Sequence, residues 1–545
     1  MNSQTSEPKN ILNGLGWWNV YFIIKIALFL KGDISFHTIE NFAFISFLLL
    51  PISFKWLKIT RAFISIPIGL WLLHFDSYLP PLDRLWSQIG QLMQFELSYL
   101  IELAGRFISL TTLLTIFTLS AAYYLLNKYL RVTVLVLIAL IYISISQSII
   151  TTPNIENTPP LLAQQQTTDQ NGKEKQPLQI SEINDDVLNN FKNNFFSEEA
   201  KRVTNFDNNT KSDAPFDLLF LSICSVAWDD IKLVGLQNHP LFDDFDIMFD
   251  NFNSATSYSG PAVIRLLRAN CGQEEHSQLF DDAASNQCYL FENLADLGFQ
   301  ENLLMNHDGV FDSFLSLIKK DGKIETNLMT QEGLTPYQKG FDGASIFRDK
   351  DVLDRWWQER KKNGNSKVVA LYNTISLHDG NRIINNNAST SLISYKRRLN
   401  NLLDDLYSFF NELKVSERNI VVVLVPEHGA GMRGDKMQIS GMREIPAPSI
   451  THVPVGLKVF GKNIERTGKT VHITAPSSYL AVSSLISNIL DQNIYELATF
   501  DPEKLVINLP ETSVVAENSG TTVIDINNKH YISLDGNTWS EYPTN

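Results

Sequence analysis

The first 150 residues carry long apolar runs with little charge, and this feature restricts the fold more than any other. Two of the runs, residues 107–126 and 132–150, approach the roughly 20 residues that a bilayer core requires. Three shorter runs cover residues 16–30, 41–54 and 62–75. We therefore expect residues 1–150 to form an α-helical transmembrane domain of about five spans.

Basic residues beside these spans predict their orientation. With the N-terminus inside the cell, inner segments hold six Lys and Arg and outer segments hold three, in line with the positive-inside rule. Five spans then place everything after residue 150 outside the cytoplasm. Residues 85–105 have the pattern of an amphipathic helix at the membrane interface. Lys25 lies within the first span. Its side chain either faces the interior of the helix bundle or, as we expect so near a helix end, reaches toward the membrane surface.

The remainder of the chain has a different composition. Residues 1–150 have a net charge of +3, whereas residues 151–545 have a net charge of −17. Because phosphate binding needs clustered positive charge, this acidity argues against nucleic acid as a main partner. Three cysteines are too few for a disulfide scaffold, and an apolar fraction of 44% excludes a wholly disordered chain.

Residues 151–212 connect the two parts. The stretch up to residue 185 is rich in Gln, Asn, Thr and Pro and has no hydrophobic period, which is typical of a flexible tether. A helical pattern over residues 181–203 then leads into the second part. At the other end, residues 501–545 have short β runs separated by Asn-Asn and Asp-Gly turn signals, so we expect a small β appendage there.

Residues 213–500 alternate between apolar strand patterns and helical patterns. Continuous apolar runs of strand length occur at residues 216–223, 368–377, 419–425 and 453–460. Helical patterns occur at residues 261–269, 390–413 and 477–490. Such runs suit strands that are covered on both faces, so we predict an α/β domain with a mainly parallel sheet. In sheets of this kind the chemistry gathers at the carboxyl ends of the strands.

Several predicted strands end in residues that can bind a cation or move a proton. Cys224 follows the first strand, and Glu427 and His428 follow the third. A carboxylate and an imidazole side by side can bind a cation such as zinc, although a solvated loop is the alternative for a Glu-His pair. His378 follows the second strand, and His452 directly precedes the fourth.

Ser259 stands at the start of a predicted helix, two residues before Pro261. It is well placed as the N-cap, with the proline in the first turn. A helix N-terminus also offers free N–H groups and a positive dipole end, which favour an alkoxide and an incoming phosphate. Ser259 is therefore either a nucleophile at a phosphate site or only a helix cap.

The three cysteines divide into a pair and a single residue. Cys271 and Cys288 are close in sequence and lie in a part predicted to be outside the cytoplasm, so we expect a disulfide between them. Cys224 is then left alone at a strand end. A small buried apolar side chain and a metal-bound thiolate both fit that position.

The order of these residues resembles the alkaline phosphatase-like superfamily, and within it the membrane-anchored phosphoethanolamine transferases. Several of the chain's sequence motifs are similar to those of the cellulose phosphoethanolamine transferase (BcsG) family of bacterial cellulose secretion systems. The stretches that carry this resemblance are LSICS (221–225), SYSGPA (257–262), RLLRANCGQ (265–273), PEHGA (426–430) and PSIT (448–451). The resemblance covers nearly the whole chain, including the spans and the paired cysteines.

The resemblance implies a Zn²⁺ ion bound by Cys224, Glu427 and His428, with Ser259 as the nucleophile in the remaining position. Positions near the substrate phosphate are matched by Tyr258, His378, Arg443 and, as often in the wider superfamily, His452. The proposed catalytic acid and base among them is His378. Most members of the superfamily have Asp or Glu in place of Cys224, and a thiolate is softer, which favours zinc over magnesium or calcium.

The implied reaction moves phosphoethanolamine from phosphatidylethanolamine to hydroxyl groups of nascent cellulose through a phosphoethanolamine–serine intermediate. The implied setting is the bacterial inner membrane, with several spans, membrane lipid around them, and the catalytic domain in the periplasm beside other cellulose synthase subunits. Three alternatives stay open: a phosphoethanolamine or phosphoglycerol transferase with another envelope acceptor, a hydrolase, or a non-catalytic structural subunit of the secretion complex.

Overall fold

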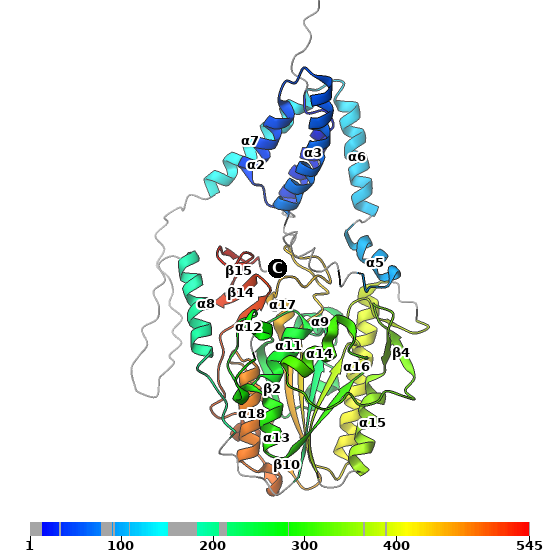
Figure 1. Cartoon of the computed structure of the whole chain (residues 1–545), viewed down its shortest axis with the longest axis vertical. Helices are drawn as coiled ribbons and strands as arrows, with labels where there is room; N and C mark the ends of the chain where they lie inside the picture. Colours follow the sequence, from blue (N-terminus) through cyan, green and yellow to red (C-terminus); the bar gives the residue numbers. More distant parts are fainter. Residues whose placement is uncertain are drawn as a thin grey trace, which may run out of the picture. The chain divides into compact units, whose positions relative to one another are not determined.

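The computed structural model describes residues 14–31, 34–77, 90, 93–107, 110–150, 183–206, 215–281, 283–362, 366–386 and 390–543. Its contacts divide the chain into two compact units (Figure 1). The N-terminal unit comprises residues 1–82 and 101–182. The second unit comprises residues 83–100 and 183–545, and we name it the catalytic unit after the function expected from the sequence. The predicted tether over residues 151–182 and the first part of the predicted interfacial helix, residues 85–89, lie outside the described residues.

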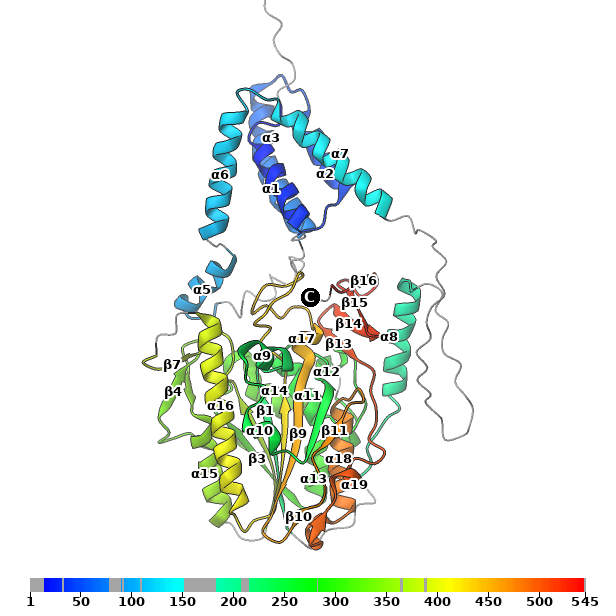
Figure 2. The ribbon, with the colours of Figure 1, turned by 180° about the vertical axis from the view of Figure 1, so that it is seen from behind.

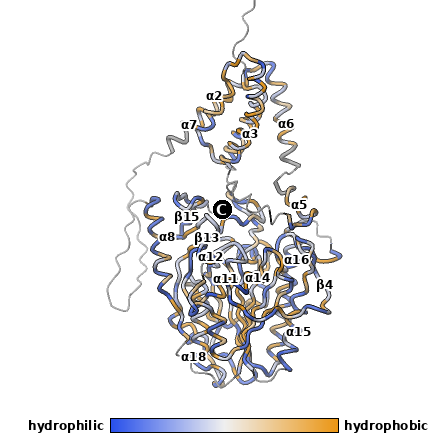
Figure 3. Tube along the Cα trace, in the orientation of Figure 1, coloured by the Kyte–Doolittle hydropathy of each residue, from blue (hydrophilic) through white to orange (hydrophobic). Residues whose placement is uncertain are grey.

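Five helices occupy the five apolar runs of the N-terminal unit. They are α1 (Trp18–Lys31), α2 (Thr38–Leu49), α3 (Lys55–Asp76), α6 (Leu110–Leu126) and α7 (Val132–Ile150). Hydrophobic residues cover much of α2 and α3 (Figure 3). Among the helical stretches whose side chains the structure describes, only α3 is long and apolar enough to cross a bilayer. The other four predicted spans stay predictions.

The prediction for Lys25 is wrong, because its side chain is fully buried inside the N-terminal unit. It forms an ion pair with Asp76, the last residue of α3, and donates a hydrogen bond to Asn41 Oδ1 at 2.7 Å. Asp76 is also bound by His37, with 2.7 Å between Asp76 Oδ1 and the ring Nδ1. A buried charge is tolerated when it is paired and hydrogen-bonded, and Asp76 supplies that pair from another helix.

A seven-stranded sheet forms the centre of the catalytic unit. Its strands are β1 (Asp217–Ile223), β2 (Ile247–Asn253), β3 (Phe299–Met305), β6 (Lys367–Thr374), β8 (Ile420–Pro426), β9 (His452–Phe460) and β11 (Val471–Ile473). Their spatial order is β11-β2-β9-β8-β1-β6-β3. All neighbouring pairs are parallel except the two that involve β9, which runs the other way. The predicted α/β domain with a mainly parallel sheet is thus confirmed.

Helices cover both faces of this sheet, as Figure 1 and Figure 2 show from opposite sides. One buried core includes side chains of α11 (Ser259–Leu267), α13 (Leu290–Asp296) and α18 (Tyr479–Asp491). The other includes side chains of α9 (Trp228–Val234), α15 (Asp349–Lys362) and α16 (Ser391–Lys414). The three helices predicted from periodicity correspond to α11, α16 and α18.

Short elements complete the catalytic unit: α5 (Leu97–Phe107, which continues into the N-terminal unit), α10 (Pro240–Asp243), α12 (Gln278–Asp281), α14 (Phe314–Asp321), β4 (Pro336–Lys339), β5 (Ser345–Phe347), β7 (Arg382–Ile383), α17 (Pro448–Thr451), β10 (Glu465–Arg466), β12 (Thr499–Phe500) and α19 (Pro502–Leu505). The strands β4, β5 and β7 form a small antiparallel sheet of their own.

The tail of the chain forms an antiparallel sheet of β13 (Val515–Asn518), β14 (Thr521–Ile526), β15 (Lys529–Ser533) and β16 (Ser540–Glu541). The helix α8 (Asp185–Glu199), close to the helix predicted after the tether, packs Leu188 against Val515 and Ile524 of this sheet. Val523 packs with Ile445, a residue of the long loop between β8 and α17. The tail sheet therefore supports that loop.

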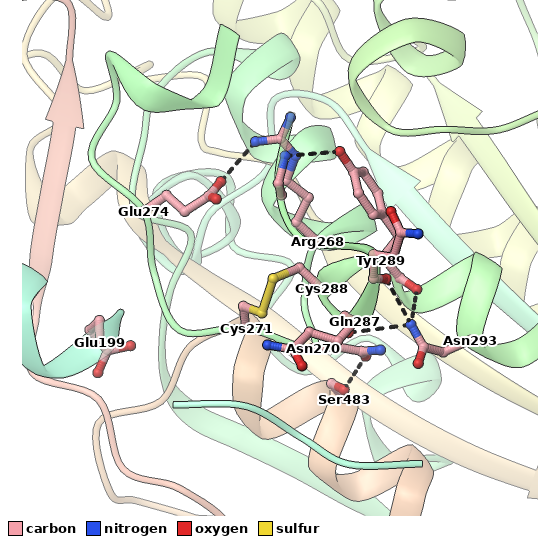
Figure 4. The surroundings of a disulfide bond; sticks show 12 residues. Glu199, Arg268, Asn270, Cys271, Glu274, Gln287, Cys288, Tyr289, Asn293 and Ser483 are labelled. Atoms are coloured by element: carbon pink, nitrogen blue, oxygen red, sulfur yellow. Dashed lines mark hydrogen bonds and ion pairs between the residues drawn. A yellow bond between two sulfur atoms is a disulfide. The ribbon is translucent and has the colours of Figure 1, made fainter. Parts of the chain in front are cut away.

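The disulfide between Cys271 and Cys288 is confirmed, and it follows helix α11 directly (Figure 4). The ion pair of Arg268 with Glu274 lies beside it, with 2.9 Å between the charged atoms. The cross-link closes a loop of 17 positions, which corresponds to about 3 kcal/mol of stabilisation by loop-closure entropy. Cys224 is free and buried.

Candidate active site

Three neighbouring strands bring the predicted site residues to one edge of the sheet. β1 lies between β8 and β6, and the parallel register pairs Ile223 with Pro426. Cys224 and Glu427 are the next residues of these two strands, so they leave the sheet side by side. On the opposite side of β1, the Cys224 N–H donates to the carbonyl of Thr374 at the end of β6 at 3.0 Å.

Cys224, Glu427 and His428 form a buried cluster whose ligand atoms all lie within 4.8 Å of one another. Zinc–ligand distances of about 2.0–2.3 Å in tetrahedral geometry place the ligand atoms about 3.3–3.8 Å apart. The separation between Cys224 Sγ and His428 Nε2 is 3.8 Å. Thiolate, carboxylate and imidazole are the donor types that zinc sites use, so the donor set and its spacing fit Zn²⁺.

The Glu427 carboxylate uses only one of its oxygens for hydrogen bonds. Oε1 accepts hydrogen bonds from the Ser222 hydroxyl, at 2.9 Å, and from the Asn373 amide. Oε2 is buried and accepts no hydrogen bond from the residues that the structure describes. Leaving a buried carboxylate oxygen unpaired costs free energy, and a bound cation would remove that cost. Burial raises the pKa of this carboxyl in the absence of a cation.

The two other members of the cluster, His428 and Cys224, can also bind a cation. His428 Nδ1 lies 2.8 Å from the carbonyl of Gly429, so we assign the ring proton to Nδ1 and leave Nε2 with its lone pair. Burial, assisted by the charge of Arg443, lowers the pKa of His428 and keeps it neutral. Burial raises the pKa of the Cys224 thiol to about 11, and the nearby Glu427 adds to this effect. A thiol in this place ionises when a bound cation compensates the charge.

Ser259 faces this cluster. Its Oγ lies 3.3 Å from Cys224 Sγ and 3.2 Å from His428 Nε2. The predicted N-cap is off by one position, because Tyr258 is the N-cap and Ser259 is the first helical residue of α11. The N–H groups of the first turn of α11 add positive potential at the hydroxyl.

Arg443 joins the cluster to His378. Its Nη1 lies 3.2 Å from His428 Nε2, and its Nη2 lies 3.4 Å from His378 Nε2. His378 Nδ1 lies 2.8 Å from the carbonyl of Asp379, which leaves Nε2 directed toward the arginine. Burial and the charge of Arg443 lower the pKa of His378 to about 3, so the imidazole is neutral at physiological pH.

The two remaining predicted residues differ in their surroundings. Tyr258 is half-buried and directly precedes Ser259. His452 begins β9, where its Nε2 lies 2.7 Å from the backbone carbonyl of Asp250 in β2. The ring of His452 is therefore engaged with the backbone of the neighbouring strand, and its role at a phosphate stays a prediction.

Asn518, at the end of β13, holds two loops of the site together, and the sequence analysis did not identify it. Its Oδ1 accepts hydrogen bonds from Thr256 Oγ1 at 2.9 Å and from the Ser257 N–H at 3.2 Å. Its Nδ2 donates to Ser257 Oγ at 2.6 Å, to the Arg443 carbonyl at 3.3 Å and to the Glu444 carbonyl at 2.9 Å. In the sequence this asparagine precedes a Ser-Gly pair and looks like an ordinary turn residue.

Comparison with known protein families extends over nearly the whole chain. Residues 172–539 match the family described as the cellulose biosynthesis protein BcsG C-terminal domain, and residues 18–145 match the BcsG N-terminal domain. The chain belongs to the BcsG family. The BcsG proteins of Escherichia coli and Salmonella typhimurium are 40% and 39% identical to it, and each alignment covers 97% of this chain and 96% of the relative.

Two solved structures show a more distant similarity to part of the chain. An alkaline phosphatase superfamily protein from Vibrio parahaemolyticus has a TM-score of 0.44 and 12% identity, covering 64% of this chain and 86% of its own. The C-terminal periplasmic domain of EcEptC from Escherichia coli has a TM-score of 0.41 and 14% identity, covering 63% of this chain and 96% of its own. The family assignment rests on the sequence matches.

Proposed function

We propose that this member of the BcsG family is a zinc-dependent phosphoethanolamine transferase that modifies nascent cellulose. The observation that carries the proposal is the position of the Ser259 hydroxyl, within 3.3 Å of both Cys224 Sγ and His428 Nε2. A hydroxyl at the start of a helix and beside three metal-binding side chains is suited to attack phosphorus. The family's link to cellulose biosynthesis supports cellulose as the acceptor.

Cys224, Glu427 and His428 would hold the zinc ion, with Ser259 in the remaining position. Bound zinc would supply positive charge that lowers the pKa of the serine hydroxyl toward neutrality. The chain itself supplies the orientation: β1, β8 and α11 fix the four side chains, and Asn373 fixes the Glu427 carboxylate.

The reaction has two transfer steps. In the first, Ser259 Oγ forms a bond to the phosphorus of phosphatidylethanolamine, and the bond from phosphorus to the diacylglycerol oxygen breaks. The proton that Ser259 gives up passes by way of the neutral His378 to the diacylglycerol oxygen, and diacylglycerol stays in the bilayer. In the second step, a cellulose hydroxyl bonds to phosphorus and gives its proton to His378. The bond between Ser259 Oγ and phosphorus breaks, and the released serine oxygen takes that proton, which restores the hydroxyl.

Arg443 and His378 serve these steps from one side of the cluster. The forked guanidinium of Arg443 is suited to bind non-bridging phosphate oxygens, and Tyr258 stands beside the attacking serine. His378 takes the proton of the incoming hydroxyl, because its imidazole is neutral. A bound phosphate offsets the charge of Arg443, which is one cause of the low pKa of His378, and so makes His378 a stronger base.

The proposed setting is the bacterial inner membrane, with the catalytic unit in the periplasm and other cellulose synthase subunits as partners. The helix α3 supports membrane attachment, because its length and composition suit a bilayer. Large side chains along it are exposed in the structure: Trp56, Phe63, Leu70 and Trp71. A lipid donor is then available at the bilayer surface.

The test uses the full-length protein in detergent, loaded with zinc and incubated with phosphatidylethanolamine. We expect a covalent phosphoethanolamine adduct by intact mass, mapped to Ser259 by peptide sequencing. The Ser259→Ala variant should form no adduct, whereas Ser277→Ala, at an exposed serine, should behave like the wild type. Addition of a soluble cello-oligosaccharide should move the group to the sugar, and release to water alone would indicate a hydrolase.

Other outcomes separate the alternatives. An adduct that forms with phosphatidylglycerol and not with phosphatidylethanolamine would indicate a phosphoglycerol transferase. An adduct that moves to another envelope acceptor and not to the oligosaccharide would change only the acceptor. A protein that binds neither zinc nor phosphoethanolamine would support the non-catalytic structural subunit.

A further inference from the structure

A short segment from the N-terminal third of the sequence belongs to the catalytic unit. Residues 83–100 group with that unit by their contacts, and residues 93–100 of this segment are described. Three of its residues, Phe95, Glu96 and Tyr99, contact the turn that carries His378 or the loop packed on that turn.

Tyr99 binds the residue that follows His378. Its hydroxyl donates to Asp379 Oδ2 at 2.8 Å, and both side chains are buried. The backbone carbonyl of Asp379 in turn accepts from His378 Nδ1. The hydrogen bond from Tyr99 therefore ends on the residue whose backbone fixes the orientation of the His378 ring.

Phe341 forms a second connection between the segment and His378. The Phe341 ring stacks on the His378 imidazole with 4.1 Å between ring centroids and 27° between the planes. Phe95 packs against the same Phe341 ring at 5.5 Å, edge to face. The Glu96 N–H donates to the Phe341 carbonyl at 2.9 Å, and the Glu96 carboxylate pairs with Lys339 at 2.6 Å.

Gly380 shows how closely the segment approaches the turn. Its φ of +83° is favourable for glycine, and a Cβ at this position would lie 2.7 Å from both Tyr99 and Phe341. No larger residue fits between the tyrosine ring and the backbone of the turn. The Tyr99 ring and the turn after His378 are thus packed in direct contact.

We infer that Tyr99 is a positioning residue for His378, and that the catalytic unit is complete only with residues 93–100. The inference rests on the proposed function, because it concerns how His378 acts on the substrate. The contacts of Tyr99 described above lie at the turn after His378, so we expect it to act on proton transfer and to leave metal binding unchanged.

The test compares two variants of the full-length protein that each remove one tyrosine hydroxyl. Tyr99→Phe removes the hydrogen bond to Asp379, and Tyr129→Phe removes a hydroxyl from a side chain that is 86% exposed. We expect Tyr99→Phe to lower kcat for transfer to a soluble cello-oligosaccharide by about tenfold to a hundredfold, the range that loss of catalytic geometry produces. The KM for phosphatidylethanolamine and the zinc content should stay at wild-type values. Tyr99→Phe with wild-type kcat and pH profile would overturn the inference.

A second experiment measures the chemical accessibility of the His378 ring and does not depend on transferase activity. Diethyl pyrocarbonate modifies accessible neutral imidazoles, and peptide mapping gives the rate for His378 alone. We expect at least a threefold faster modification of His378 in Tyr99→Phe than in Tyr129→Phe. Equal rates would overturn the positioning role even if the wild type transferred nothing. A third outcome separates the two proposals. If His378→Ala transfers phosphoethanolamine at the wild-type rate and Tyr99→Phe still speeds the modification of His378, the proposed catalytic role of His378 is refuted, whereas the effect of Tyr99 on the position of His378 stands.

Discussion

Replacing Asn518 with alanine removes the amide that ties the loop before Ser259 to the loop of Arg443. The amide oxygen accepts two hydrogen bonds, and the amide nitrogen, with two protons, donates to Ser257 Oγ and to backbone carbonyls. Four such bonds contribute about 1 kcal/mol each, and water in the space left by the amide restores part of that. We therefore expect a loss of about 2–4 kcal/mol in the free energy of unfolding of the catalytic unit.

This loss converts to a shift in the midpoint of thermal unfolding. For a unit of roughly 380 residues, the entropy of unfolding is about 0.8 kcal/mol per degree, so the midpoint should fall by about 3–5 °C. The assay is tryptophan fluorescence during heating of the full-length protein in detergent. The matched control is Asn400→Ala, which removes an asparagine whose amide, among the residues that the structure describes, donates a hydrogen bond to Asp404 on the surface of α16.

The two variants are expected to differ clearly. Asn400→Ala should shift the midpoint by less than 1 °C, because exposed hydrogen bonds of this kind contribute little. Asn518→Ala should also lower transfer activity at temperatures where the protein is fully folded, since Arg443 loses one of its backbone anchors. If Asn518→Ala unfolds at the same temperature as Asn400→Ala, the tail sheet does not hold the two loops together and the reasoning is refuted.

Three further predictions concern the metal, the pH dependence and the disulfide. Cys224→Ser should bind less than a tenth of the wild-type zinc by mass spectrometry of the metal, because a serine hydroxyl is a poorer zinc ligand than a thiolate; a full equivalent of zinc would contradict its role. Burial raises the pKa of the Asp349 carboxyl to about 6. Between about pH 4 and 6 the folded protein therefore keeps the carboxyl protonated, whereas the unfolded chain releases the proton. The free energy of unfolding should fall by about 3 kcal/mol as the pH rises through that window. Asp349→Asn should lack this fall in thermal scans from pH 4 to 7, and an unchanged pH profile would exclude Asp349 as its source. Replacing both Cys271 and Cys288 with serine should lower the free energy of unfolding by about 3 kcal/mol relative to the oxidised wild type, and reduction of the wild type should cause the same loss.

The sequence predicts those parts of the site that directly adjoin a strand or helix with a clear apolar pattern. The apolar runs before Cys224 and before Glu427 predict buried strands, and parallel pairing brings their carboxyl ends to one edge. The helix after Ser259 is predicted by Pro261 and by its apolar periodicity. Local patterns were sufficient because each of these residues directly adjoins the element that positions it.

Other features depend on contacts between segments far apart in the chain. The strands β2 and β3 were missed because Asp250 and Asn251 in β2, and Gln300 and Glu301 in β3, break the apolar pattern. The opposite direction of β9 has no local signal, because strand direction is set by the path of the chain. The same holds for Asn518, whose hydrogen bonds go to residues more than 70 positions away.

The environment of Lys25 could not be predicted from its own helix either. Its partner Asp76 lies on α3, and the polar group is completed by Asn41 from α2. In the sequence Lys25 interrupts an apolar run, whereas Asn41 and Asp76 lie at the ends of two other runs, and nothing local indicates that the three residues meet. A pairing of this kind is a property of helix packing and not of composition.

The single buried thiol has a consequence for how the chain oxidises as it folds. Three cysteines allow three pairings, and two of these would consume Cys224. Cys224 becomes buried only when β8 has paired with β1, and His428 lies 204 positions further along the chain. Until then its thiol is open to exchange with Cys271 and Cys288, which lie nearer in sequence. The yield of native protein should therefore depend on a disulfide isomerase or on slow oxidation. Rapid oxidation should trap chains in which Cys224, the proposed metal ligand, is tied up in a disulfide.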